Sequence, residues 1–295
     1  GFMAVSSPQF RSNPLTLRIL VIGLCCSALA LASGSILAQT LKAGAKTTAS
    51  AGIDIESFNN ASDSPLLRVG NKGAAVARAQ ILLDRAWFSC GEIDGRYAAN
   101  MQRMVKAFQS ARDLKVTGTV TAETWKALRE DTAPLLTRYT VTEKDMVGPF
   151  EKTPADMNER AKLKALVYES VEETLSEKFH TSIAYLKQLN RGRKVEAGNE
   201  IAVPNTSGTS TPVKAASIQI DKSERVLYVL DAAKRPVAGF PISIGNEKND
   251  PLPVGMMAVK NEVKNPSFTY DPKLLKSAPK DAEKVDIAPG PNNPV

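Results

Sequence analysis

The chain has 295 residues, about twice the usual length of one domain, so two or three modules are expected. Its 43% hydrophobic residues are enough to form their cores, which excludes a wholly disordered or fibrous protein. Basic residues outnumber acidic ones by 38 to 31 without a basic block, so the net charge of +7 gives little support for nucleic-acid binding and suits attraction to an anionic cell wall.

The N-terminal segment is predicted to direct export. Arg11 and Arg18 precede an uncharged apolar run at residues 19–31, and small residues then lead to Ala38. These are the three parts of a secretory signal, with cleavage expected near Ala38. Because the chain stays uncharged up to Leu41, an uncleaved membrane anchor is the alternative. Residues 1–38 are therefore assigned as a signal peptide or anchor, and the rest is expected in the periplasm or cell envelope.

Cysteine and histidine are scarce in this sequence. Cys25 and Cys26 lie within the apolar run, so signal cleavage would leave Cys90 as the one thiol and permit no intrachain disulfide. His180 has no second histidine or cysteine nearby, so neither a metal site nor a cofactor is expected. Nothing in the sequence brings Cys90 and His180 together, so a catalytic pair of these two is not expected.

Two segments with different composition follow the apolar run. Residues 39–64 are mostly Ala, Ser, Thr, Lys, Gly and Asn, and are expected to form a flexible tether. Residues 65–132 have helical periodicity instead, with Gly70, Gly73, Gly95 and Gly118 at the predicted turns. The apolar stripes of three predicted helices are Val76, Ala79, Leu83 and Ala86, then Met101, Met104, Phe108 and Ala111, then Trp125 and Leu128 after the capping Thr121.

This pattern resembles the three-helix peptidoglycan-binding domain. The matching positions are Val69-Gly70-Asn71-Lys72-Gly73, Val76, Gln80, Leu83, Asp94-Gly95-Arg96-Tyr97, Phe108-Gln109, Gly118 and the segment from Thr121 to Leu128. The resemblance implies binding to the stem peptides or glycan of the wall. Leu83, Phe108 and Trp125 are expected in the core. The candidates for a surface binding groove are Asp94, Tyr97 and Gln109.

Residues 139–205 are predicted to have a short strand at each end and helices between them. The stretches from Tyr139 to Val141, Leu175 to Asn190 and Gly198 to Asn205 resemble a degenerate LysM module. The second of the predicted helices in this module begins at Thr181-Ser182. Residues 148–170 are an insertion relative to the family pattern, so carbohydrate binding and a spacer role both remain open. The first helix is predicted to be long and amphipathic, with Ala161, Ala165, Tyr168, Val171 and Leu175 on its apolar face.

A linker is expected at residues 206–212, and the period then changes to two across residues 213–295. Strands are predicted around Ile218 and Ile220, across residues 226–230, and where Phe240, Ile242 and Ile244 alternate with smaller residues.

Several motifs of this region resemble the first half of an L,D-transpeptidase catalytic domain of the YkuD type. They are Asp221, Leu227-Tyr228-Val229, the run from Phe240 to Gly245, the run from Asp250 to Gly255, Asn265-Pro266, Tyr270-Asp271-Pro272 and the run from Pro289 to Val295. The resemblance implies acyl transfer through a cysteine acyl-enzyme, with Tyr270, Asn292 and Asn293 bordering the substrate groove.

The catalytic cysteine and histidine of that family lie downstream of the motif that ends here at Val295. No residue is therefore assigned as nucleophile or base, and the chain is expected to be an inactive, C-terminally truncated fragment. Half of a β-domain is also expected to leave unpaired strand edges, disorder or aggregation from about Ala215 onward.

The sequence thus predicts a multidomain α+β protein: a three-helix peptidoglycan-binding bundle, a LysM-like module and the first half of a β-rich catalytic domain. The expected function is that of an exported L,D-transpeptidase that cross-links stem peptides, with cross-linking, protein attachment and hydrolysis left open. The alternatives are a non-catalytic peptidoglycan-binding protein and a signal-anchored scaffold without wall affinity. The expected partners are wall peptides and glycan, not nucleic acid, and a membrane only through an uncleaved N-terminal segment.

Overall fold

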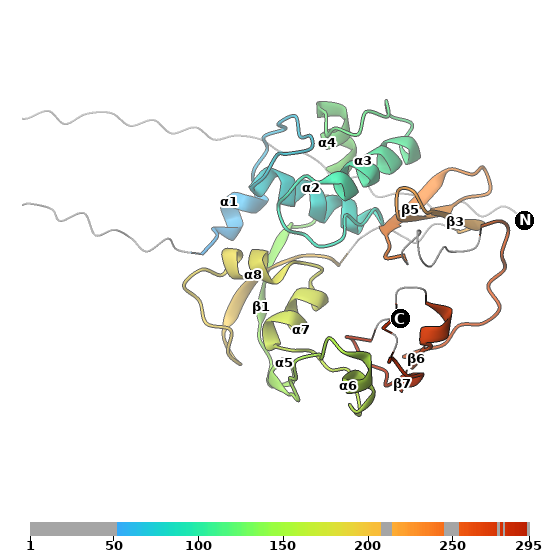
Figure 1. Cartoon of the computed structure of the whole chain (residues 1–295). Coiled ribbons are helices and arrows are strands. Elements are labelled where there is room, and N and C mark those ends of the chain that lie inside the picture. The colour runs from blue at the N-terminus through green and yellow to red at the C-terminus, as the bar shows by residue number, and fades with distance from the viewer. Residues whose placement is uncertain (1–51, 208–213, 245–253, 276–277, 280, 294–295) are drawn as a thin grey trace, which may run out of the picture. The chain divides into compact units, whose positions relative to one another are not determined.

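The structure, a computed structural model, describes residues 52–207, 214–244, 254–275, 278–279 and 281–293 (Figure 1). These residues all belong to one structural unit, Thr48–Val295. The expected signal segment, the first part of the tether and most of the expected linker lie outside the described residues. Within the described ranges, no helix is both long and apolar enough to cross a membrane.

A three-helix bundle forms where the helical periodicity predicts it. Its helices are α2 (Ala74–Arg85), α3 (Ala99–Ala111) and α4 (Ala122–Leu128). The predicted cap of the third helix is confirmed, because the Thr121 hydroxyl accepts a hydrogen bond from the backbone N–H of Thr124 at 3.3 Å.

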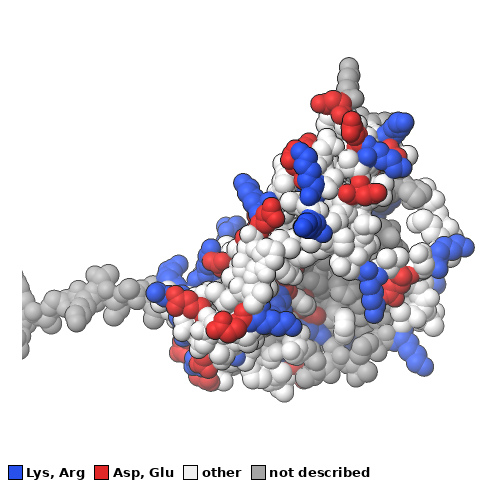
Figure 2. Space-filling view, turned by 90° about the horizontal axis from the view of Figure 1, so that it is seen from below, with Lys and Arg blue, Asp and Glu red and all other residues white. Residues whose placement is uncertain are grey.

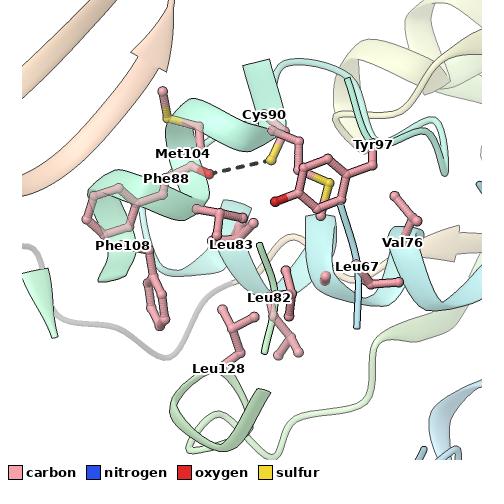
Figure 3. Packing of buried hydrophobic residues seen from close by; sticks show 14 of the residues in the cluster. Leu67, Val76, Leu82, Leu83, Phe88, Cys90, Tyr97, Met104, Phe108 and Leu128 are labelled. Carbon is pink, nitrogen blue, oxygen red and sulfur yellow. Dashed lines mark hydrogen bonds between the residues drawn. The ribbon is translucent and has the colours of Figure 1, made fainter. Parts of the chain in front are cut away.

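The core of the bundle contains the residues expected there. Leu83, Phe108 and Trp125 are all buried in one apolar cluster, part of which is seen in Figure 3. The rings of Phe88 and Phe108 meet edge to face with their centroids 5.8 Å apart. The indole N–H of Trp125 donates to the Pro65 carbonyl at 2.8 Å, which satisfies its polar atom inside the core.

The expected flexible tether is partly wrong, because its end is structured. Helix α1 (Ile55–Asn59) lies within it, and its two apolar residues, three positions apart, are both buried. The side-chain amide of Asn59 donates to the Leu136 carbonyl at 3.0 Å and accepts from the Leu136 N–H at 2.8 Å. Composition alone missed this helix, since tertiary contacts with distant residues stabilise it.

The two end strands expected for the middle module are present. Strands β1 (Leu136–Thr140) and β2 (Glu200–Pro204) pair antiparallel, and α8 (Ile183–Leu189) begins as predicted after its cap Ser182. The short helix α5 (Glu143–Met146) follows β1.

The long amphipathic helix expected in this module is wrong. Two short helices stand in its place, α6 (Met157–Ala161) and α7 (Val171–Lys178). Ser170 has an extended backbone, and its hydroxyl accepts from the Glu173 N–H at 3.1 Å, so a new helix starts there. The apolar residues upstream of Ser170 pack against the C-terminal part of the chain instead of extending the helix.

Asp145 holds together the helical corner of the middle module. Its carboxylate accepts from the hydroxyls of Tyr139 and Thr142, at 2.6 and 2.7 Å, and from the ammonium of Lys178 at 3.0 Å. Burial disfavours the charged carboxylate, but these hydrogen bonds outweigh burial and hold the pKa of Asp145 well below its usual range.

The inserted segment of the middle module forms a small unit with the end of the described chain. Strands β6 (Phe268–Tyr270) and β7 (Val285–Ile287) pair antiparallel, with the 3₁₀ helix η1 (Pro272–Leu274) between them, and α6 packs on β7. Leu166 is the buried centre of their shared cluster. The insertion, residues 148–170, therefore has a packing partner within the chain.

The expected strands after residue 213 are largely confirmed as a three-stranded antiparallel sheet in the order β3 (Ser217–Asp221), β4 (Val226–Leu230) and β5 (Pro236–Pro241). The strand predicted through Ile244 stops at Pro241.

The expected disorder from about Ala215 onward is not found in residues 214–244, because the sheet packs on the bundle. The Gly239 N–H donates to the Trp87 carbonyl at 2.9 Å, and the Ser89 N–H donates to the Gly239 carbonyl at 3.0 Å. Val226 is buried in the core cluster of the bundle. These bonds cover the β5 edge, whereas both isoleucines of β3 are exposed.

Candidate functional site

The loop between α2 and α3 is built around the side chain of Gln80. Its carbonyl oxygen accepts from the backbone N–H groups of Asp94 and Gly95 at 3.2 and 2.8 Å, and its amide donates to the Asp94 carboxylate at 2.9 Å. That carboxylate also accepts from the Arg96 N–H at 2.8 Å. Gly95 has a φ of +68°, which glycine adopts without strain. Asp94, half-buried, therefore lies at the margin of the bundle and shapes this loop.

The expected surface position of Tyr97 and Gln109 is wrong. Both side chains are buried, and the Tyr97 hydroxyl donates to the Gly118 carbonyl at 3.0 Å. Gln109 bonds the loop that leads to α4, receiving backbone N–H bonds from Thr117 and Gly118 and donating to the Thr119 carbonyl. Because polar side chains inside a small bundle satisfy loop backbone, these two residues fix the loops of the bundle and are not part of a surface groove.

A cleft of about 530 Å³ lies where the bundle, the middle module and the β3–β5 sheet meet. We call it the junction cleft. Its walls come from the end of α2 and the loop after it, the turn between α7 and α8, and the last residues of β5. The residues that line it include Asp84, Trp87, Glu92, Glu177, His180 and Phe240.

An imidazole–carboxylate pair joins two walls of the junction cleft. The Nδ1 atom of His180 lies 2.8 Å from a carboxylate oxygen of Asp84. This hydrogen bond outweighs partial burial and raises the pKa of His180 above its usual value. The Ile93 N–H donates to the His180 carbonyl at 2.8 Å, and the Ser182 N–H donates to the Ile93 carbonyl at 3.2 Å. His180 thus fastens the middle module to the bundle.

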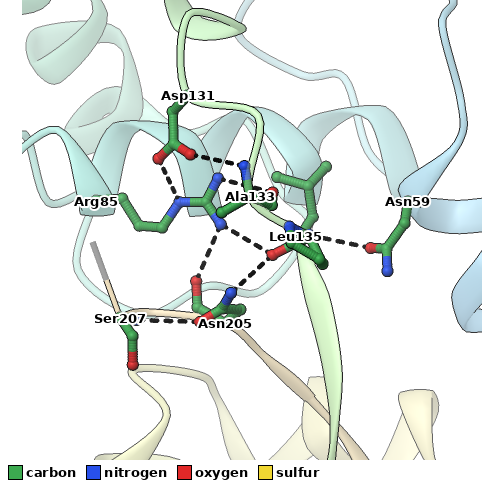
Figure 4. A network of polar contacts seen from close by, with 8 residues as sticks. Asn59, Arg85, Asp131, Ala133, Leu135, Asn205 and Ser207 are labelled. Carbon is green, nitrogen blue, oxygen red and sulfur yellow. Dashed lines mark hydrogen bonds and ion pairs between the residues drawn. The ribbon is translucent and has the colours of Figure 1, made fainter. Parts of the chain in front are cut away.

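Arg85 makes a second connection beside the cleft (Figure 4). Its side chain is wholly buried, and its guanidinium pairs with Asp131 at 2.7 Å. It also donates to the carbonyls of Ala133, Pro134 and Asn205, at 3.2, 3.0 and 3.4 Å. Its charge is therefore used to tie the end of the bundle to one end of the β1–β2 pair, where the chain enters β1 and leaves β2.

The structure brings the segments of Cys90 and His180 together, which the sequence did not indicate. Their side chains nevertheless have separate partners: the Cys90 thiol lies 4.0 Å from the Phe88 carbonyl (Figure 3), and His180 bonds Asp84. Burial raises the pKa of the Cys90 thiol strongly, and the nearby carboxylates of Asp84 and Asp94 add to this. A thiol in this environment is protonated and shielded, which is unfavourable for a nucleophile.

The candidate groove residues near the C-terminus lie together against the inserted segment. Tyr270 is buried beside Leu166, and the Asn292 side-chain amide donates to the Val167 carbonyl at 2.8 Å. The Asn293 side-chain amide donates to the Ala288 carbonyl at 2.8 Å. In the described structure these side chains hold the C-terminal segment in place, so a substrate groove at this position stays a prediction.

Charge does not single out another site on the face shown in Figure 2, where basic and acidic side chains are interspersed. Within the described ranges, no group of three or more histidine, cysteine, aspartate or glutamate residues is placed to hold a metal ion.

Comparisons with known proteins bear on the bundle. Residues 72–128 match the family model described as a putative peptidoglycan binding domain. This match supports peptidoglycan as a partner and an association with the cell wall. It covers a minor part of the chain, so it describes the bundle and not the modules that follow.

Searches with the whole chain add less. No curated protein matches it. Among solved structures, the crystal structure of the SleB N-terminal domain is similar, with 26% sequence identity over 25% of this chain and 100% of that chain, at a TM-score of 0.24. A TM-score this low supports no conclusion about fold or function.

The sequence did not indicate the junction cleft. Trp87 follows the last turn of a helix, and Glu177 and Phe240 lie far along the chain, so no motif groups them. The available signal was a large aromatic residue in a position expected to be exposed, just after a predicted helix end.

Proposed function

We propose that this chain is an exported peptidoglycan-binding protein of the cell envelope, with the bundle as its wall-binding module. The family match of residues 72–128 carries this proposal. The confirmed helices and buried core support it, because a binding surface needs a rigid scaffold.

Co-sedimentation with purified sacculi tests this function. The full chain is expected to pellet with sacculi and to remain bound at about 0.5 M salt, where attraction between its positive charge and an anionic wall is screened. An unrelated protein of similar net charge is the control and should be released at that salt. A chain that stays in the supernatant, or is released together with the control, would contradict wall recognition.

We further propose that residues 213–295 are part of an L,D-transpeptidase catalytic domain. The ordered motifs from Asp221 to Val295 support this, as does the antiparallel pairing of β3, β4 and β5. Such an enzyme would cleave a donor stem tetrapeptide, release its terminal D-alanine and pass the acyl group from cysteine to an acceptor amine. Cys90 is unsuited to act as the nucleophile of such an enzyme, because it is buried and its pKa is raised.

A non-catalytic wall-binding protein is the alternative, and the separate partners of Cys90 and His180 favour it for this chain. The two functions differ in their products. Protein expressed from the complete reading frame is incubated with stem tetrapeptides, and mass spectrometry follows D-alanine release and peptide dimers. Release with dimers supports the transpeptidase, whereas wall binding without either product supports the alternative.

A further inference from the structure

The junction cleft presents an aromatic residue in a fixed position. Trp87 has a φ of +70°, and the residue is 41% exposed. Its backbone N–H donates to the Asp84 carbonyl at 3.0 Å, and its carbonyl accepts from Gly239. A left-handed backbone conformation is unfavourable for tryptophan. Burial of the ring does not fully offset this cost here, because the residue stays exposed. The two backbone bonds therefore fix the main chain of Trp87 at the cleft, while the residue stays exposed.

The electrostatic character of the same cleft is acidic. Glu92 and Glu177 are exposed, and within the described part of the chain neither takes part in an ion pair. Asp84 adds no free charge, because its carboxylate is buried and paired with His180, whose raised pKa favours the cationic imidazole. The positive charge of Arg85 is taken up by Asp131 and three carbonyls, as described above. The accessible charge of the cleft is therefore negative.

An aromatic face beside carboxylates is suited to bind a cation. The face of an indole carries negative electrostatic potential and attracts an ammonium group, and nearby carboxylates add attraction and accept its hydrogen bonds. Phe240, half-buried on β5, supplies apolar surface for the carbon chain that carries the ammonium. A volume of about 530 Å³ admits a short peptide segment.

We propose that the junction cleft binds the primary ammonium group of a short peptide. This inference rests on the proposed wall-binding function, in which the ligand is a stem peptide with a free side-chain amine. Because the sides of the cleft come from the bundle, the middle module and the β3–β5 sheet, the ligand contacts all three. Recognition of the cell wall then requires residues outside the family match. The bound peptide also stabilises the packing of the modules on one another.

The test uses the full chain and a synthetic stem tripeptide, N-acetyl-L-Ala-γ-D-Glu-L-Lys, in which the blocked N-terminus leaves the ε-amine as the single cation. Binding is measured by calorimetry and by tryptophan fluorescence, in which Trp87 is the responsive residue because Trp125 is buried. The tripeptide should bind, and the same peptide acetylated on the ε-amine should bind at least about tenfold more weakly, since acetylation removes the cation. An oligosaccharide of N-acetylglucosamine is the third probe and should not bind at the cleft.

Variants of the cleft locate the binding. The double substitution Glu92→Gln with Glu177→Gln should weaken tripeptide binding about tenfold, and Trp87→Ala should weaken it similarly while Trp87→Phe keeps most of it. Glu200→Gln, an exposed glutamate on β2, is the matched control and should leave binding unchanged. Circular dichroism and thermal melting check that each variant is folded. If a variant unfolds, the acetylated peptide on the unmodified chain still decides the question.

Three results would overturn the inference: no tripeptide binding, equal binding of the acetylated peptide, or binding unaffected by the double substitution. Binding of the oligosaccharide alone would also overturn it and would make the cleft a sugar site. Sedimentation with sacculi separates this failure from that of the proposed function. If the chain pellets with sacculi at high salt but does not bind the tripeptide, the proposed peptide binding in the cleft is refuted and the proposed wall binding is not.

Discussion

Removal of the Gln109 side chain should destabilise the bundle. The amide is fully buried on α3, and its oxygen accepts from the N–H groups of Thr117 and Gly118 at 2.9 and 3.0 Å. Its nitrogen donates to the Thr119 carbonyl at 2.8 Å and to the Thr124 hydroxyl at 2.9 Å. One side chain thus satisfies the loop that positions α4.

The magnitude follows from the groups that Gln109→Ala leaves unpaired. The N–H of Gly118 would lose its partner while buried, and the N–H of Thr117 and the Thr119 carbonyl would each lose a partner while half-buried; each loss costs roughly 1–3 kcal/mol. Alanine recovers a few tenths of a kcal/mol through its higher helix propensity, and water entering the space left by the amide recovers more. The expected loss in the free energy of unfolding is therefore about 3–5 kcal/mol.

Urea unfolding followed by the fluorescence of buried Trp125 measures this loss. Gln188→Ala is the matched control, because Gln188 lies exposed on α8, and its change should stay within about 0.5 kcal/mol. Co-sedimentation of Gln109→Ala with sacculi should weaken in proportion to the unfolded fraction. A loss below about 1 kcal/mol, or one equal to the control, would refute the reasoning that this amide satisfies the loop.

Three further predictions concern contacts within and between the modules. The His180–Asp84 contact raises the pKa of His180, so its stabilisation is present below the ordinary histidine pKa of about 6.5 and is lost as pH rises through the raised value. NMR titration of this single imidazole should show the raised pKa, and Asp84→Asn should lower it. The low pKa of Asp145 gives the opposite dependence: its stabilisation is present above the ordinary aspartate pKa of about 3.9 and is lost as pH falls, and Asp145→Asn should remove this dependence in thermal melts. Gly290→Ala should release the C-terminal segment, because a Cβ there would lie 2.7 Å from the carbonyl carbon of Leu166 and Gly290 has a φ of +148°; faster hydrogen exchange across β6 and β7 would report it.

Each of these predictions has a contradicting result. A His180 pKa at the ordinary histidine value in the unmodified chain would contradict its pairing with Asp84. An acid melt of Asp145→Asn identical to that of the unmodified chain would show that the carboxylate is already protonated or unpaired. Unchanged hydrogen exchange in Gly290→Ala would mean that the segment around Leu166 moves to admit a methyl group.

The sequence predicted the elements that depend on local chemistry. The bundle helices follow from apolar residues at helical spacing and from caps such as Thr121, whose partner is three residues away. The strands after residue 213 follow from alternation and turn residues. Where a local start signal was overlooked, as at Ser170, the predicted long helix was wrong.

The candidate site was less predictable, because its residues are selected by contacts between distant segments. Whether a polar residue in a family motif is exposed depends on the loop that folds over it, so the motif did not reveal the burial of Tyr97 and Gln109. The role of the inserted segment came from tertiary contacts, such as the bond from Asn292 to Val167 across 125 residues. Local sequence thus determined the helices and strands of the bundle and the sheet, whereas tertiary packing alone decided that Asp84, Trp87 and His180 share one cleft, because no periodicity or spacing records which distant backbones will meet.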